Sequence, residues 1–165
     1  MSTAMIALGV FCRRHLTITV TPSLPYRLFF LKRETPRKGD YVLFQHRSKY
    51  LEGTNLFVKQ VVCVEGEILE IRERNYFCDN RYLGSAKEYT LKGVRRLHLL
   101  TGIGWIPPDA MNRLLDTERL EPFVFHGTIP VGFLFLMAPH KDSYDSRYFG
   151  FIKREEILAV ANPLF

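Results

Sequence analysis

A serine held between two prolines is a candidate for covalent chemistry. Ser23 stands in the run Thr21-Pro22-Ser23-Leu24-Pro25, where the two proline rings restrict the backbone on either side of it. A free serine hydroxyl is a weak nucleophile and needs a neighbouring base to take its proton. The turn therefore predicts a rigidly presented hydroxyl, and rigid positioning supplies a large part of a catalytic rate.

Lys59 is the candidate base, because a lysine amine accepts a proton once it is neutral. It is the single charged residue of the apolar run 56–64. In a strand, alternate side chains share a face, so Lys59 shares its face with Phe57 and Val61. Burial on such a face lowers a lysine pKa, because the charged form loses its hydration. The pattern favours a buried amine with a lowered pKa.

Each of these two residues also has an ordinary structural interpretation. A serine in a proline-rich turn is usually a turn residue, and a lysine in an apolar strand often extends its amine to the strand edge. The two features alone therefore do not establish a Ser–Lys dyad. Their order along the chain and the residues around them must decide.

The elements that would position this pair are short strands. Nine prolines, eleven glycines and many β-branched and aromatic residues favour strands joined by turns. We expect a mainly β fold of antiparallel sheets, with one small helical insertion. The helix is predicted over 109–120, which follows Pro107 and Pro108 and carries leucines at 114, 115 and 120. The predicted strands are 17–20, 26–31, 41–45, 56–64, 68–72, 76–83, 123–125, 131–137 and 148–152.

Composition narrows the class of protein. The chain has 165 residues, which is the size of one domain. Hydrophobic residues make up 47% of it and charged residues 24%, a composition that favours a packed core and argues against global disorder. The net charge of +6 suggests two kinds of anionic partner, nucleic acid and an anionic membrane surface. The basic residues are spread along the chain, and their densest group is Lys92, Arg95 and Arg96. A solvated loop or strand edge is the better interpretation of that group.

The cysteines give no sign of a metal or cofactor. Cys12, Cys63 and Cys78 contain no Cys-x-x-Cys pair, so we expect no metal site and no cofactor, and at most one disulfide. Cysteine usage does not decide the redox compartment.

The N-terminal segment leaves three interpretations open. The apolar run 5–11 is followed at once by Cys12, Arg13 and Arg14. A spanning helix needs about 20 apolar residues, and a secretory signal carries its basic residues before the apolar stretch. The segment is therefore a stub of a longer membrane anchor, a helix on the membrane surface, or a packed terminal strand.

Four short sequence motifs, or boxes, follow one another along the chain, and their order is informative. They are 21–28 around Ser23, 38–44 with Gly39-Asp40, 57–67 around Lys59, and 142–151, the last preceded by the strand 129–135. In this order they resemble the type I signal peptidase family (S26), and most closely its conjugative-transfer branch of TraF-type peptidases. Only Leu24 separates Ser23 from Pro25, where housekeeping signal peptidases have two residues, and this shorter spacing points to the conjugative branch. Residues from about 75 to 125 are unmatched.

The resemblance implies a role for each matched residue. Ser23 would attack the scissile carbonyl, and Lys59 would take its proton and return it to the leaving amine. Ser143 would orient the Lys59 amine. The hydroxyl of Thr21 and the backbone N–H of Ser23 would stabilise the oxyanion.

The rest of the last box has an expected structural role. Asp145 and Arg147 are expected to form an ion pair that holds this box beside the dyad. Met137-Ala138-Pro139 replaces the Gly-Asp-Asn of the family, so we expect no catalytic role between 137 and 142 and interpret His140 as a loop residue.

The resemblance also implies a biological setting. We expect an N-terminal segment 1–20 near a membrane anchor and a catalytic domain 21–165 with an insertion at about 75–125. The enzyme would remove the leader from an exported precursor, in particular a conjugative pilin, with cyclisation as an alternative outcome if an amine resolves the acyl-enzyme. It would lie at the bacterial inner membrane, face the periplasm, contact the membrane surface and bind no nucleic acid.

Two other functions compete with this one. A self-cleaving repressor with the same chemistry needs a DNA-binding helix-turn-helix, yet 22 residues precede Ser23. A non-catalytic basic β-barrel that binds nucleic acid would use Tyr76, Phe77 and Tyr82 for base stacking. Steep salt dependence of single-strand binding would identify the second.

Overall fold

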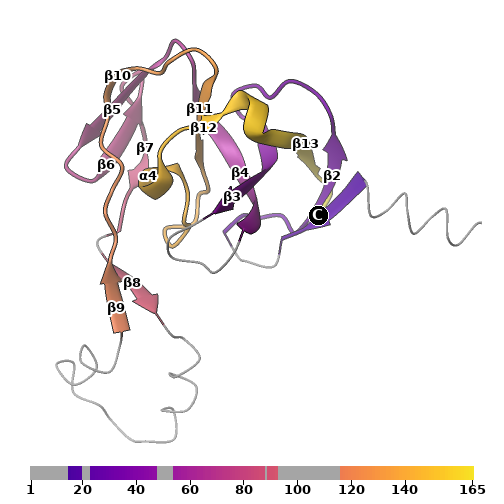
Figure 1. Cartoon of the computed structure of the whole chain (residues 1–165), viewed down its shortest axis with the longest axis horizontal. Helices are drawn as coiled ribbons and strands as arrows, with labels where there is room; N and C mark the ends of the chain where they lie inside the picture. Colours follow the sequence, from indigo (N-terminus) through magenta and orange to yellow (C-terminus); the bar gives the residue numbers. More distant parts are fainter. Residues whose placement is uncertain (1–14, 20–22, 48–53, 88, 93–115) are drawn as a thin grey trace, which may run out of the picture.

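The computed structural model describes residues 15–19, 23–47, 54–87, 89–92 and 116–165. Its architecture is the mainly antiparallel β fold that the sequence predicts, with two packed sheets and a separate two-stranded ribbon (Figure 1).

The first sheet carries Lys59 near its middle. Its order is β1-β2-β13-β3-β4-β11-β12, and every neighbouring pair is antiparallel. The long strand β4 lies between β3 and β11, so its residues are covered on both edges. The bounds are β1 Leu16–Ile18, β2 Leu28–Lys32, β3 Tyr41–Arg47, β4 Thr54–Val64, β11 Phe133–Met137, β12 Ile152–Lys153 and β13 Ile157–Pro163.

The second sheet has the order β10-β5-β6-β7. Its strands are β5 Ile68–Arg72, β6 Asn75–Cys78, β7 Arg81–Ser85 and β10 His126–Thr128. Asp79 and Asn80 connect β6 to β7 with φ angles of 47° and 63°, which these two residue types tolerate in a tight hairpin turn. Residues 75–85, which match none of the family boxes, therefore form part of this sheet.

One buried apolar cluster joins the two sheets. Cys63 and Phe135 come from the first sheet, while Leu69, Tyr76 and Cys78 come from the second, and all are almost fully buried. A disulfide between Cys63 on β4 and Cys78 on β6 crosses this interface, with 5.9 Å between the two Cα atoms. The sequence allowed one disulfide, and the structure shows which pair forms it.

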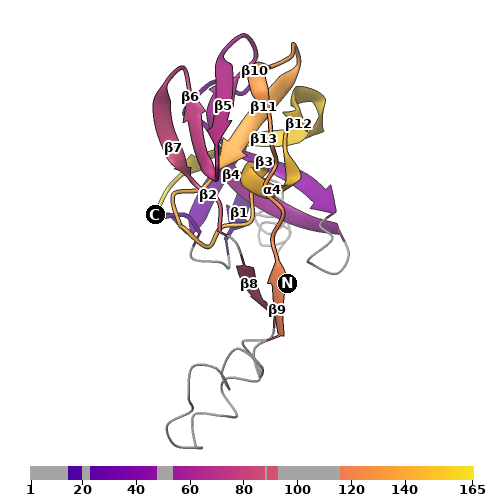
Figure 2. The same ribbon diagram turned by 90° about the vertical axis from the view of Figure 1, so that its left-hand side faces the viewer.

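The ribbon corrects the predicted helix. Strands β8 Tyr89–Lys92 and β9 Asp116–Arg119 pair with each other and project from the body (Figures 1 and 2). The helix predicted over 109–120 is therefore wrong for 116–119, while 109–115 lie outside the described residues. Ala86 and Leu120 are both buried in the body, so the chain leaves and returns side by side, which favours strand pairing over the helix that the leucine spacing indicates.

Helical structure in the described residues is limited to short turns. The turn α4 (Ser146–Phe149) follows Ser143, and the 3-10 turn η1 (Arg154–Glu156) precedes β13. Gly150 ends α4 at φ 79°, where a Cβ would lie 2.8 Å from the Phe123 ring, so no larger residue fits there without movement. Among the residues that the structure describes, no helix has the length and apolarity to span a membrane.

Candidate active site

Ser23 lies in the turn between β1 and β2 and is buried. The next residue, Leu24, belongs to a buried apolar cluster with Val58 of β4 and Ala138 at the end of β11. Val58 precedes Lys59, and Ala138 starts the loop that leads to Ser143. This cluster therefore gathers the chain segments of the predicted catalytic residues Ser23 and Lys59 and of the predicted orienting residue Ser143. Thr21 lies outside the described residues.

Lys59 points from β4 into apolar surroundings. It pairs with Val42 of β3, on the sheet face that also holds Phe57 and Val61, and it is 4% exposed. Its amine donates a hydrogen bond of 2.6 Å to the hydroxyl of Ser143 and lies 5.8 Å from the centre of the Phe57 ring. The shared apolar face predicted from the strand alternation is present.

The electrostatics of this position lower the pKa of Lys59 to about 8. Burial is the main cause, since the ammonium loses its hydration; the charge of Asp145 raises the pKa and that of Arg147 lowers it. With this pKa, about one amine in ten is neutral at pH 7. A lysine in this state can accept a proton near neutral pH.

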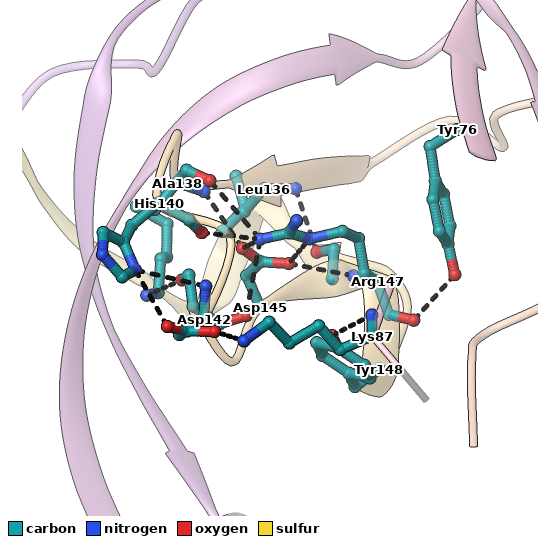
Figure 3. A network of polar contacts seen from close by, with 12 residues as sticks. Tyr76, Lys87, Leu136, Ala138, His140, Asp142, Asp145, Arg147 and Tyr148 are labelled. Atoms are coloured by element: carbon teal, nitrogen blue, oxygen red, sulfur yellow. Dashed lines mark hydrogen bonds and ion pairs between the residues drawn. The ribbon is translucent and has the colours of Figure 1, made fainter. Parts of the chain in front are cut away.

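Asp145 and Arg147 form a buried ion pair beside this amine. The Nε atom of Arg147 donates to Asp145 Oδ1 at 2.8 Å, and its Nη2 atom donates to Oδ2 at 2.7 Å. Asp145 also accepts the backbone N–H of Ala138 at 3.1 Å and caps the first turn of α4 (Figure 3). Removing one partner from such a pair costs about 3–5 kcal/mol, because a charge is left buried and uncompensated.

Arg147 also holds the loop that carries Ser143. Its Nη2 atom lies 3.4, 3.3 and 3.4 Å from the carbonyl oxygens of Ala138, His140 and Ser143, and its Nη1 atom donates to Ser85 at 2.9 Å. One guanidinium thus contacts the loop at three points (Figure 3). The hydroxyl of Ser146 accepts the N–H of Leu136 at 2.9 Å and ties α4 to β11.

The segment that matches no family box, at about 75–125, makes contacts with the last box that were not predicted from the sequence. The Tyr76 hydroxyl lies 2.8 Å from the carbonyl oxygens of both Phe123 and Arg147. Lys87 donates its backbone N–H to the Tyr148 hydroxyl at 2.8 Å, and its amine pairs with Asp142 (Figure 3). Tyr76 shows no sequence signal beyond strand alternation, because its partners lie 47 and 71 residues away.

The two sulfurs of the cysteine cluster in the described part of the chain are bonded to each other. Within the described residues, one group of side chains lies close enough together to be considered as metal ligands: Cys63, Glu67 and Cys78. The two sulfurs are joined in the disulfide, so no thiolate is available to bind an ion.

Comparison with known proteins identifies the family. A family model described as signal peptidase, peptidase S26, matches residues 3–165. The conjugal transfer protein TraF of Agrobacterium fabrum (strain C58 / ATCC 33970) is 51% identical over 50 residues, which are 30% of this chain and 28% of that protein. The crystal structure of a signal peptidase I from Enterococcus faecalis V583 matches with a TM-score of 0.43 and 21% identity, covering 78% of this chain and 98% of that one.

The family match covers nearly all of the chain. It confirms the resemblance that the four boxes indicated, and at the level of the family it confirms a serine peptidase of the signal-peptidase type. The chain belongs to the signal peptidase family, peptidase S26.

Proposed function

We propose that this protein is a serine endopeptidase in which Ser23 is the nucleophile and Lys59 the general base. The observation that carries the proposal is the state of the Lys59 amine. It is buried, it donates a hydrogen bond to Ser143, and its pKa is lowered to about 8. A general base works best when its pKa lies near the working pH.

The surroundings of Lys59 support this role over a structural one. A buried lysine in a purely structural role is normally paired with a carboxylate, which holds its charge in place. Here both oxygens of Asp145 are taken by Arg147, and no ion pair among the described residues involves Lys59. The amine contacts a neutral hydroxyl instead, so its deprotonation breaks no ion pair.

The proposed reaction follows from the donors and acceptors. A neutral amine has two hydrogens and one lone pair, so a hydrogen bond to Ser143 uses one hydrogen and leaves the lone pair available to a second partner. That partner would be the Ser23 hydroxyl, which attacks the scissile carbonyl while Lys59 takes its proton. Lys59 then protonates the leaving amine, and water or an amine resolves the acyl-enzyme. The Thr21 hydroxyl and the Ser23 N–H would stabilise the oxyanion.

The proposed substrate is the leader of an exported precursor, in particular a conjugative pilin. The likeness to a conjugal transfer protein supports this choice. Hydrolysis and cyclisation remain alternatives that the product mass separates, because hydrolysis adds one water to the products and cyclisation does not.

The proposed location is the bacterial inner membrane, with the catalytic domain in the periplasm. The disulfide Cys63–Cys78 supports an oxidising compartment. Apolar side chains are exposed where β1 and β13 end and β2 begins: Ile18 is 69% exposed, Phe165 is 80% exposed, and Leu164 is also exposed. Exposed apolar groups of this kind support contact with a membrane surface.

The competing nucleic-acid function loses part of its support. It required exposed aromatic faces, yet Tyr76 is fully buried and Phe77 is half-buried, which leaves Tyr82 as the exposed ring of the three.

The proposal is tested by cleavage of a pilin-like precursor, read by mass spectrometry. We expect the wild-type protein to cleave after a small residue and the Ser23→Ala protein to leave the precursor intact. Equal cleavage by both proteins would contradict the assignment of Ser23.

A further inference from the structure

The turn α4, which follows Ser143, is fixed by a tyrosine from the second sheet. Tyr76 lies on β6, is 0% exposed, and has its hydroxyl 2.8 Å from the carbonyl oxygen of Arg147 (Figure 3). The same hydroxyl is 2.8 Å from the carbonyl oxygen of Phe123, so one proton is shared between two acceptors. The backbone N–H of Phe123 also donates to the Arg147 carbonyl at 2.8 Å.

Arg147 connects this contact to Ser143. Its backbone carbonyl is held by Tyr76, and its guanidinium binds Asp145 and the carbonyl oxygens of the loop that includes Ser143. Ser143 in turn accepts the hydrogen bond of Lys59. A displacement of the Arg147 backbone would therefore move the hydroxyl that orients the amine.

Two strands hold this loop from two sheets. Strand β4 presents Lys59 to Ser143, and β6 presents Tyr76 to Arg147. The disulfide joins the same two strands, four residues after Lys59 and two residues after Tyr76. The strands that bear the two contacts are thus covalently fixed to each other.

We propose that Tyr76 is a positioning residue for the Lys59–Ser143 contact and that its hydroxyl acts through Arg147. The inference rests on the proposed function only for its effect on cleavage, since the geometry it concerns exists whatever the substrate is.

The ring and the hydroxyl of Tyr76 have separable roles. The ring stacks on Phe135 with 5.6 Å between centroids and fills the cluster between the sheets, which a phenylalanine ring would fill equally well. Only the hydroxyl reaches Arg147. After Tyr76→Phe, the Arg147 carbonyl keeps its bond from Phe123, so the fold is preserved while one constraint on α4 is lost.

The experiment compares Tyr76→Phe with a matched control, Tyr82→Phe. Tyr82 lies on the neighbouring strand β7, is 56% exposed, and its hydroxyl contacts Ser85 Oγ at 2.8 Å. Three quantities are measured on each protein: the titration of Lys59 by NMR of its side chain, hydrogen exchange of residues 143–149, and kcat and KM on the precursor. Circular dichroism establishes that both variants are folded at the assay temperature.

In Tyr76→Phe we expect faster exchange in 143–149 and a higher Lys59 pKa than in the wild type, because a looser loop admits water to the amine. We expect kcat to fall about 5- to 30-fold with little change in KM. Tyr82→Phe should match the wild type in all three. If the Lys59 titration and the exchange are the same in both variants, Tyr76 fills space only and the proposal is overturned.

The two proposals fail in distinguishable ways. If none of the proteins cleaves a precursor, the proposed function fails, while the titration and the exchange still decide the role of Tyr76. If kcat falls without any change in the Lys59 titration, the hydroxyl acts by another route and the proposed coupling through Arg147 is wrong.

Discussion

Replacing Lys59 by methionine should abolish activity and at the same time make the protein more stable at neutral pH. The burial of Lys59 lowers its pKa from 10.5 to about 8, which at about 1.4 kcal/mol per pKa unit corresponds to about 3 kcal/mol of destabilisation when the amine is charged. Methionine has a similar volume and no charge to desolvate. Loss of the hydrogen bond to Ser143 offsets about 1 kcal/mol of this gain.

The expected net gain is therefore about 2 kcal/mol at pH 7, or about 4–8 °C in the unfolding temperature of a chain of this size. The gain depends on pH in a defined direction. The folded-state pKa of Lys59 lies below the unfolded-state value, so the penalty is fully present below pH 8. Between pH 8 and about 10.5 the folded protein loses this proton first and the wild type becomes more stable, so the difference between the two proteins shrinks.

The assay is urea unfolding of wild type, Lys59→Met and a control, Lys153→Met, at pH 7 and pH 10. Lys153 is an exposed lysine whose amine lies 3.5 Å from Glu155, so its replacement should change little. The reasoning is refuted if Lys59→Met is no more stable than the wild type at pH 7, or if its advantage is the same at both pH values.

Three further predictions concern the same site. The rate of precursor cleavage should rise through a half-maximum near pH 8 and level off above it, because only neutral Lys59 accepts the serine proton; a rate that is flat from pH 6 to 10 would contradict a lysine base. Arg147→Met should lower the free energy of unfolding by about 3–5 kcal/mol, since it leaves the Asp145 carboxylate buried and unpaired; a loss below about 1 kcal/mol in urea unfolding would show that the pair is not buried in solution. Replacing Cys63 and Cys78 together by serine should lower stability by about 3 kcal/mol, because the disulfide closes a loop of 15 residues; free-thiol counting by mass spectrometry checks the bond, and three free thiols in the oxidised wild type, one for every cysteine of the chain, would rule it out.

Local sequence was sufficient to predict the surroundings of the candidate base. Lys59 could be placed on an apolar strand face from its alternation with Phe57 and Val61, because strand periodicity fixes which side chains share a face. Ser23 is buried in its proline-bounded turn, and Ser143 accepts the hydrogen bond of the amine. These residues lie in short boxes, and the residue types and spacing within each box were enough to select them as candidates.

Contacts between distant segments could not be predicted in this way. Nothing near Tyr76 indicates that its hydroxyl meets Arg147, 71 residues later, and the pairing of Cys63 with Cys78 depends on how two sheets pack. The helix predicted over 109–120 failed at 116–119 because pairing with β8 outweighed the local leucine spacing. Tertiary contacts decide such positions, and one sequence does not show them.

The most direct test of the central claim is acylation of Ser23 by an activated peptide ester, followed by mass spectrometry across pH 6 to 10. This measurement requires no knowledge of the natural precursor. We predict an adduct on Ser23 whose rate of formation rises through pH 8 in the wild type, and no adduct in Lys59→Met. An adduct on Ser23 that forms equally fast in Lys59→Met, or an adduct on another residue, would contradict the Ser23–Lys59 dyad.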